Sequence, residues 1–169
     1  MDQLKTAIRE KGIAVEELRQ YSYDTNRNQT DIKNTKTGED QTYVYDAENR
    51  LSQVSVTKDG KTAMIQQNIY NGEGQRIQKV DGDEMTNYYY QDGVVAYTTD
   101  ANGEQNSQNL IGTDGNVLAT ERFQQNATQY YLYNKDIQES TSSLVKEDGS
   151  ADATYQYTDF GETTIQGND

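Results

Sequence analysis

Closely spaced turn signals divide this chain into segments of strand length. Asp-Gly, Asn-Gly or Thr-Gly pairs occur at 37–38, 59–60, 81–82, 92–93, 102–103, 114–115 and 148–149. Such pairs favour the left-handed backbone of tight hairpins. The chain also has no proline, so every residue after the first can donate a backbone hydrogen bond. The sequence therefore predicts an all-β fold, a long antiparallel sheet of repeated hairpins.

The composition predicts a thin core. Leu, Ile, Val and Phe make up only 27 of the 169 residues, and the net charge is −13. That combination is also typical of disordered chains, so disorder is the alternative hypothesis. Against it stand the missing proline and the 14 tyrosines, since each buried ring removes about 150–250 Å² from water. We expect a folded chain.

The first 20 residues differ from the rest of the chain. Leu4, Ala7, Ile8, Val15 and Leu18 recur at roughly helical spacing among good helix formers. We expect a short N-terminal helix that packs on a sheet edge, and the alternative is a frayed leader. The predicted domains are therefore a helical leader over 1–20 and a β-sheet domain over 21–169.

Charge and residue content exclude several classes of function. With 28 acidic and 15 basic residues, the chain repels nucleic acid and anionic membranes. It has neither histidine nor cysteine, so disulfides, Ser-His-Asp triads and typical zinc sites are excluded. No apolar run approaches the roughly 20 residues that span a bilayer. The first residues contain no signal h-region, so an export signal would lie outside this sequence.

Carboxylates are the remaining candidates for catalysis or metal binding. A carboxylate pair could support glycoside hydrolysis, but most acidic residues lie in or next to turn signals, as at 81–84. Calcium binding at these turns is conceivable, although no twelve-residue calcium loop is present. Glycosylation sequons occur at 28–30 and 126–128 and matter only in a eukaryotic secretory pathway. We predict a non-enzyme without cofactor or metal.

A tyrosine phrase recurs at 21–24 (YSYD), 43–46 (YVYD), 70–77 (YNGEGQRI), 131–134 (YLYN) and 155–161 (YQYTDFG). The spacing, with Tyr90 included, is 20–25 residues except for a gap of 43 residues from Tyr90 to Tyr133, which leaves room for one degenerate copy. In Tyr-x-Tyr both rings project from one sheet face, where they can form cross-strand ladders. The Asp or Asn that follows can start the turn. Apolar residues then sit three apart, as at 51 and 54, which predicts a bulge or a strand that uses both faces. The residues with predicted structural roles are Tyr21, Tyr23, Asp24, Tyr43, Tyr45, Asp46, Tyr70, Gly74, Arg76, Tyr133, Tyr155, Tyr157 and Gly161.

These phrases resemble the YD-repeat, or Rhs-repeat, family of bacterial surface and toxin-delivery proteins. The segment 70–77 matches the family unit well, and the resemblance covers about residues 21–165. Three positions depart from the pattern. Arg27 and Asn49 stand where the family usually has glycine, and Thr158 replaces an aspartate.

The resemblance implies a β-sheet strip that forms part of a spiralling hollow shell. It also implies a structural, non-enzymatic role at the bacterial surface or outside the cell. The implied partners are further YD repeats or a toxin or cargo domain, and exposed sheet edges would allow homo-oligomers. A strip of about a dozen strands would cover only roughly a quarter of a shell around a ~100-residue cargo. The sequence contains neither the proline-containing segment that precedes the toxin in this family nor a recognisable toxin.

Two tyrosine clusters suggest a second function on the same scaffold. Consecutive tyrosines in a strand place rings on both faces, and exposed rings can stack on sugars. We therefore keep carbohydrate binding or adhesion as the alternative function, and packing of these rings as the structural alternative. The candidate ligand-binding residues are Tyr88, Tyr89, Tyr90, Tyr130 and Tyr131.

Overall fold

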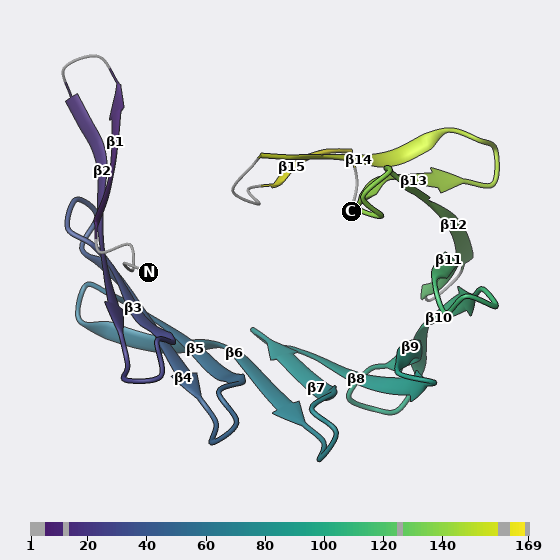
Figure 1. Cartoon of the computed structure of the whole chain (residues 1–169), viewed down its shortest axis with the longest axis horizontal. Coiled ribbons are helices and arrows are strands. Elements are labelled where there is room, and N and C mark those ends of the chain that lie inside the picture. Colours follow the sequence, from purple (N-terminus) through teal and green to yellow (C-terminus); the bar gives the residue numbers. More distant parts are fainter. Residues whose placement is uncertain (1–5, 12–13, 125–126, 159–162, 168–169) are drawn as a thin grey trace. The chain divides into compact units, whose positions relative to one another are not determined.

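The computed structural model describes residues 6–11, 14–124, 127–158 and 163–167, and every helix or strand assigned within them is a β-strand. The chain divides into two compact units, Met1–Met85 and Thr86–Asp169. Within each unit the strands are antiparallel and follow chain order (Figure 1). The predicted all-β class and antiparallel hairpin order are confirmed. The strands are β1 (Thr6–Lys11), β2 (Ala14–Tyr23), β3 (Gln29–Asn34), β4 (Glu39–Tyr45), β5 (Leu51–Lys58), β6 (Lys61–Tyr70), β7 (Arg76–Asp81), β8 (Glu84–Gln91), β9 (Val94–Thr99), β10 (Gln105–Ile111), β11 (Val117–Gln124), β12 (Ala127–Lys135), β13 (Thr141–Lys146), β14 (Ala151–Tyr157) and β15 (Thr163–Gly167).

The N-terminal helix predicted before Tyr21 is wrong, because the described part of this segment forms β1 and β2. In their antiparallel pairing Ile8 lies opposite Leu18. An isolated helix shorter than about 12–15 residues is marginal in water, whereas β2 pairs with β1 and also with β3. Two ladders of backbone hydrogen bonds outweigh the helical spacing of the apolar residues. The domain boundary at 20–21 stays a prediction.

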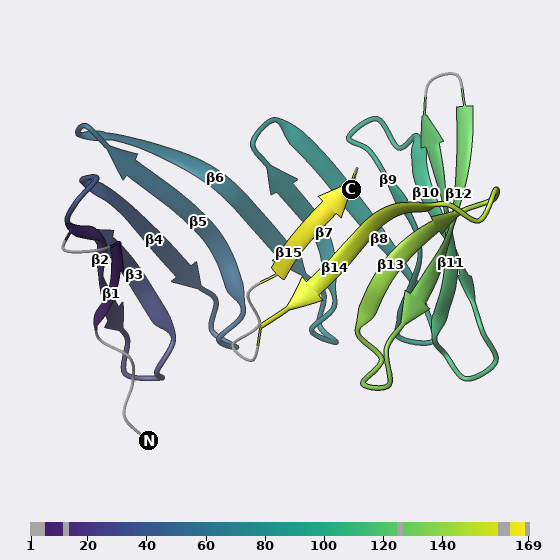
Figure 2. The ribbon, with the colours of Figure 1, turned by 90° about the horizontal axis from the view of Figure 1, so that it is seen from above.

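Cross-strand register gives the sheet of the first unit two unlike faces. Tyr43 lies opposite Val54, which is 7% exposed. Asn68, on the same face two residues beyond the partner of Val54, is 5% exposed. The next residues along these strands, Val44 and Ile69, point to the other face and are 45% and 44% exposed. At these positions one face is better covered than the other, although the strands form a single layer (Figure 2).

The buried cluster of the second unit lies on β12, β13 and β14. Tyr131, Leu144 and Ala153 are buried, with Tyr133 and Tyr155 packed against them. Leu144 lies opposite both Tyr133 and Ala153, so the cluster follows directly from strand register. Leu144 is the largest side chain among the described residues that is fully buried, with 1% exposure. The core is as thin as the composition predicts.

The loops between strands are of two main kinds. At Asp59-Gly60 and Asp92-Gly93 both residues have positive φ, between 50° and 85°, as two-residue type I′ turns require. The predicted tight hairpins at 102–103, 114–115 and 148–149 are different. Of each pair only the glycine has positive φ, and it belongs to a longer turn described below.

Candidate functional site

A five-residue turn recurs directly after the tyrosine phrase. In the turns that begin at Asp24, Asp46 and Asn71, the first N–H donates to the fifth carbonyl at 2.9 Å. The fourth N–H donates back to the first carbonyl at 3.0–3.1 Å. The strand register shifts at each of these turns. The shift leaves one unpaired residue between 51 and 53, and it explains why the apolar positions 51 and 54 are three apart.

The fourth residue of this turn needs a left-handed backbone. Its φ is 72° at Arg27, 62° at Asn49 and 82° at Gly74. Glycine adopts this conformation without the steric cost that a Cβ brings. The structure thus shows why glycine suits this position, and it places Arg27 and Asn49 in strained backbone.

The first side chain of the turn supplies a second set of hydrogen bonds. Oδ1 of Asp46 accepts the N–H groups of Glu48 at 3.0 Å and Arg50 at 2.9 Å. Asn71 makes the same two bonds within its own turn. Desolvation raises the pKa of Asp46, but hydrogen bonds from the Arg50 backbone and side chain and from Glu48 outweigh it, so the pKa is lowered below its usual value. Asp24 shows the same balance, with Asn28 as the principal donor.

The second tyrosine of the phrase is hydrogen-bonded to a residue beside an earlier turn. The Tyr45 hydroxyl donates to the Gln29 carbonyl at 2.9 Å, and Tyr70 donates to the Leu51 carbonyl at 2.9 Å. Tyr157 makes the equivalent bond to the Thr141 carbonyl at 2.7 Å in the second unit. Each acceptor is the first residue after an earlier five-residue turn, which spans 24–28, 46–50 or 136–140. Tyr45 and Tyr70 therefore each join the turn that follows them to an earlier turn of the same kind.

Arg50, which the sequence analysis did not single out, holds two turns of the first unit together. Its Nε and Nη2 donate to Asp46 at 2.7 Å and to Glu48 at 3.0 Å. Its Nη1 donates to the Asn71 carbonyl of the next turn at 3.2 Å. Its guanidinium also lies 4.9 Å from the centre of the Tyr70 ring. The sequence signal for this role was the Asp-x-x-x-Arg spacing of the turn.

The turns beginning at Asp24 and Asp46 are joined in a similar way by three asparagines. Oδ1 of Asn49 accepts the side-chain amides of Asn26 at 2.9 Å and Asn28 at 2.8 Å. Asn49 therefore does two things, because it both adopts the left-handed backbone and bridges two turns. The three turns of the first unit form a connected polar series.

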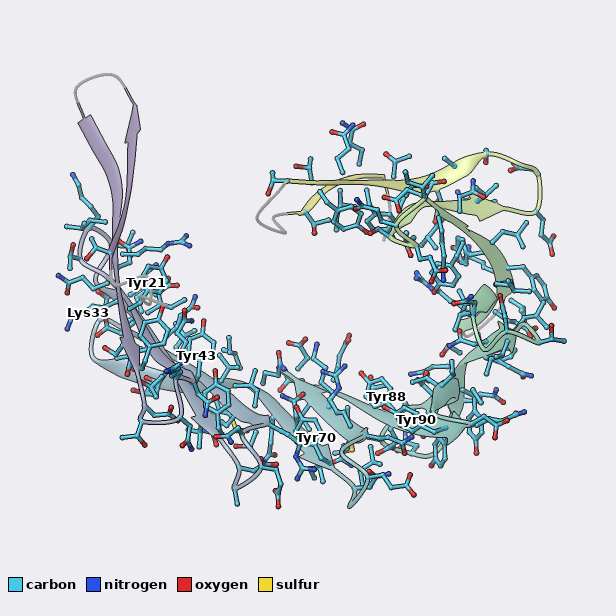
Figure 3. The ribbon with its side chains drawn as sticks, viewed as in Figure 1. Tyr21, Lys33, Tyr43, Tyr70, Tyr88 and Tyr90 are labelled. Carbon is cyan, nitrogen blue, oxygen red and sulfur yellow. The ribbon has the colours of Figure 1, made fainter. Side chains whose placement is uncertain are left out.

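The first tyrosine of the phrase makes contacts within its own strand and face. Tyr43 and Tyr131 each donate to a glutamine two residues earlier, at 2.7 Å. Burial is the largest cause that raises the pKa of both hydroxyls. Tyr21 and Tyr43 are the first tyrosines on β2 and β4, whereas Tyr70 on β6 directly precedes its turn as Tyr45 does (Figure 3). The aromatic ladder that we expected from this spacing stays a prediction.

The remaining motif residues are placed as follows. Tyr23 ends β2 and is half-buried, and Arg76 begins β7 opposite Tyr70. Nη1 of Arg76 donates to Oδ1 of Asn68 at 3.4 Å. Gly161 lies outside the described residues.

The second unit repeats the turn at places that do not directly follow the tyrosine phrase. Turns that begin at Asp100 and Asp136 have the same backbone and Oδ1 hydrogen bonds. The turn after Tyr133 therefore begins three residues beyond the tyrosine, whereas the phrase predicted its start at Asn134. In the turns that begin at Gly112 and Lys146 the side-chain acceptor is instead the third residue, Asp114 or Asp148. The backbone geometry recurs more widely than the residues that signalled it.

The predicted ligand-binding tyrosines are divided between two faces. Tyr89 is 41% exposed and stacks on Tyr97, with ring centres 4.4 Å apart and planes within 8°. Tyr130 is 48% exposed, but Tyr131 beside it is 4% exposed and belongs to the buried cluster. Figure 3 shows Tyr88 and Tyr90 on β8, where both are half-buried.

The described residues form surface hollows but no metal-binding cluster. Among the described residues no three acidic side chains gather closely enough to hold a metal ion. The better-formed hollows are open surface depressions of about 270 Å³, two of which flank Tyr130. The part of the chain that the structure describes also contains no apolar helix long enough to cross a bilayer.

With this geometry in hand, comparison with known proteins gives both sequence and fold relatives. No family model matches the chain. Over 146 residues, 85% of this chain, it is 32% identical to the tRNA3(Ser)-specific nuclease WapA of Bacillus spizizenii and 31% identical to the tRNA nuclease WapA of Bacillus subtilis. The chain resembles a small part of much larger nucleases. It spans 6% of the length of each.

The fold is also similar to part of a toxin complex. The chain aligns with the Photorhabdus luminescens Tc holotoxin pore with a TM-score of 0.56 and 17% identity, over 89% of this chain and 9% of that one. At this identity the likeness concerns the fold alone. A similar fold therefore also occurs within a much longer chain.

Proposed function

We propose that this chain is a non-enzymatic structural module of a YD-repeat surface or toxin-delivery protein and forms part of a β-sheet shell. The observation that carries the proposal is the tyrosine hydroxyl bond to the first residue after an earlier turn, made by Tyr45, Tyr70 and Tyr157. A repeat that bonds to its predecessor builds an extended structure in which each unit contacts its neighbours. The similarity to a short segment of long WapA chains supports this role.

The same proposal names partners and a location. Unpaired edges favour association with further strands, and among the described residues β15 pairs with β14 alone. Further repeats of a parent protein are the first proposed partner, a toxin or cargo domain is the second, and self-association is the third. The proposed location is the bacterial surface or the extracellular space, as the family resemblance implies.

Amide hydrogen exchange on the Tyr70→Phe variant tests the structural role. Loss of the hydroxyl bond should raise exchange in both turns that it joins, 46–50 and 71–75, because each turn depends on its neighbour. Tyr89→Phe, at an exposed ring in the second unit, is the matched control and should leave both turns unchanged. Faster exchange confined to 71–75 would contradict the neighbour dependence. Hydrolysis of tRNA or of a polysaccharide by the purified chain would contradict the non-enzymatic role.

Carbohydrate binding is the second candidate function, and the exposed Tyr89–Tyr97 stack favours it. Each ring uses one face on the other, so a sugar would have to stack on an outer face. A glycan array tests this directly. Under this hypothesis Tyr89→Ala abolishes binding and leaves the fold intact, and an array without hits for the parent chain rejects it.

A further inference from the structure

One row of side chains crosses five strands of the second unit on a single face. Tyr89 lies opposite Tyr97, Tyr97 opposite Gln108, Gln108 opposite Glu121, and Glu121 opposite Tyr130. Directly paired residues of antiparallel strands project from the same face. We call this set the acidic tyrosine row.

The face that carries the acidic tyrosine row is exposed and partly apolar. Tyr89, Tyr97 and Tyr130 are 36–48% exposed. Leu110 and Leu132, each two residues along its strand from a member of the row, are 62% and 55% exposed. Tyr131 and Thr120 on the opposite face are each 4% exposed. The two faces of β11 and β12 therefore differ sharply in how well they are covered.

Tyr130 stands between two hollows, each with a carboxylate. A hollow of about 270 Å³ on one side is lined by Gln108, Leu110 and Glu121 and by no basic residue. The hollow on the other side, of the same size, is lined by Glu147 and Asp148. Lys146 also lines this second hollow, but its ammonium is paired with the Asp152 carboxylate. The charge around the exposed ring is therefore negative.

The negative charge around Tyr130 also raises the pKa of its hydroxyl. Its hydrogen bond to the Glu121 carboxylate is the largest cause that raises the pKa of Tyr130, and the charge of Glu147 adds to it. The whole second unit has 3 basic and 13 acidic residues, a net charge of −10. A ligand of this face must therefore be cationic or neutral.

The same chain already shows which cation such a group of residues holds. In the first unit the Arg50 guanidinium lies over the Tyr70 ring and pairs with Asp46 and Glu48. In the second unit the Arg122 guanidinium lies 5.0 Å from the centre of the Tyr131 ring. A planar guanidinium can stack on a ring and donate to carboxylates at the same time.

We propose that the exposed face around Tyr130, with Glu121 and Glu147 on either side, binds an arginine-bearing extended segment of a partner protein. The guanidinium stacks on the Tyr130 ring and donates to the Glu121 carboxylate. Apolar side chains of the segment contact Leu110 and Leu132. The site stands independently of the structural role proposed above, because it depends only on groups within the second unit.

Binding of designed peptides to the full chain tests the proposal. The probes are three nine-residue peptides in which threonine alternates with arginine, lysine or glutamate, and affinity is measured by calorimetry at about 20 and 300 mM salt. We expect the arginine peptide to bind at least about threefold more tightly than the lysine peptide. We expect no binding of the glutamate peptide. The arginine peptide should bind more weakly at high salt, because salt screens the attraction between the guanidinium groups and the carboxylates.

Variants separate the site from general charge attraction. Glu121→Gln should weaken binding of the arginine peptide about fivefold or more, while Glu104→Gln, an exposed glutamate of the same unit outside the row, should change it less than about twofold. Tyr130→Phe keeps the ring and should bind at least as well as the parent, whereas Tyr130→Ala should lose most of the affinity. Circular dichroism checks that each variant is folded. Equal effects of Glu121→Gln and Glu104→Gln, absence of arginine-peptide binding, or preference for a neutral oligosaccharide would each overturn the proposal.

Discussion

The two units repeat one backbone turn but stabilise it with different side chains. In Met1–Met85 there are 12 basic and 15 acidic residues, a net charge of −3, whereas Thr86–Asp169 has 3 and 13, a net charge of −10. The first unit joins its turns through Arg50 and Asn49. The second unit instead buries Tyr131, Leu144 and Ala153 in one cluster.

This difference shows what a hairpin repeat needs and what it can vary. The bulged five-residue turn with its left-handed fourth position is present in both units. The polar series between turns and the apolar cluster are alternative means of holding neighbouring strands. A nearly balanced charge suits the polar series, since the Arg50 guanidinium needs carboxylates within reach. The second unit has few cations, and it relies on burial.

Leu144→Ala should have the largest effect, because it truncates the largest fully buried side chain of the described residues. Such truncations destabilise by about 2–5 kcal/mol. The loss should fall mainly on the second unit, so amide exchange should rise in β12–β14 and change little in β3–β6. Leu118→Ala, at a leucine of the same unit that is 47% exposed, is the matched control with a small effect. If both variants melt at similar temperatures, the second unit does not depend on its buried cluster.

Tyr45→Phe should have the next largest effect, and it should fall on the first unit. The change removes only the hydroxyl that donates to the Gln29 carbonyl, a bond worth about 0.5–1.5 kcal/mol net. Tyr45→Ala should cost more, because it also removes the half-buried ring. Urea unfolding of the two variants beside Tyr89→Phe measures both contributions. If Tyr45→Phe unfolds like the parent, the bond between turns contributes no stability.

Acid should weaken the turns through their aspartates. The folded-state pKa of Asp46 is lowered from 3.8, so its stabilising effect is present above about pH 4 and is lost as pH falls through the folded pKa. Asp46→Asn should therefore narrow the difference in stability between pH 6 and pH 3. Asp59→Asn is the control, because it removes the same charge from a two-residue hairpin turn. If the melting temperature falls by the same amount from pH 6 to pH 3 in Asp46→Asn and in the parent, the proposed linkage is wrong.

The smallest effect should come from the left-handed fourth position, and it should differ in sign between units. Glu139 has φ of 64° and is exposed, so Glu139→Gly should stabilise by up to about 1 kcal/mol. Asn49→Gly relieves the same strain but loses two side-chain hydrogen bonds to Asn26 and Asn28. It should gain nothing or destabilise. Thermal melts that rise equally for both variants would show that the asparagine bridge is unimportant.

Much of this fold could be predicted because its signals are local. Gly pairs, absent proline and the three-residue spacing at 51 and 54 predict hairpins with bulges, and these features depend on short segments of backbone. The N-terminal strands could not be predicted in this way, because the pairing of Ile8 with Leu18 and of β2 with β3 is tertiary. The turn at Asp136 was also missed, because it begins two residues beyond the end of the tyrosine phrase at 131–134.

The candidate sites show the same limit. The hydroxyl of Tyr45 finds its acceptor 16 residues away and that of Tyr70 19 residues away, so these bonds depend on register that no single phrase contains. The phrase indicated which tyrosines matter, but the contact they make came only from the structure. The acidic tyrosine row is harder still to predict from the sequence, because its five members come from five different strands.

The bond from each tyrosine to the residue after an earlier turn also gives the repeat a direction. The acceptor carbonyl always comes earlier in the chain than the donor hydroxyl, as with Gln29 before Tyr45 and Thr141 before Tyr157. A chain that emerges from the ribosome therefore exposes each acceptor before its donor has been synthesised. Every new hairpin can dock on one that is already complete, so the sheet can grow in the order of translation.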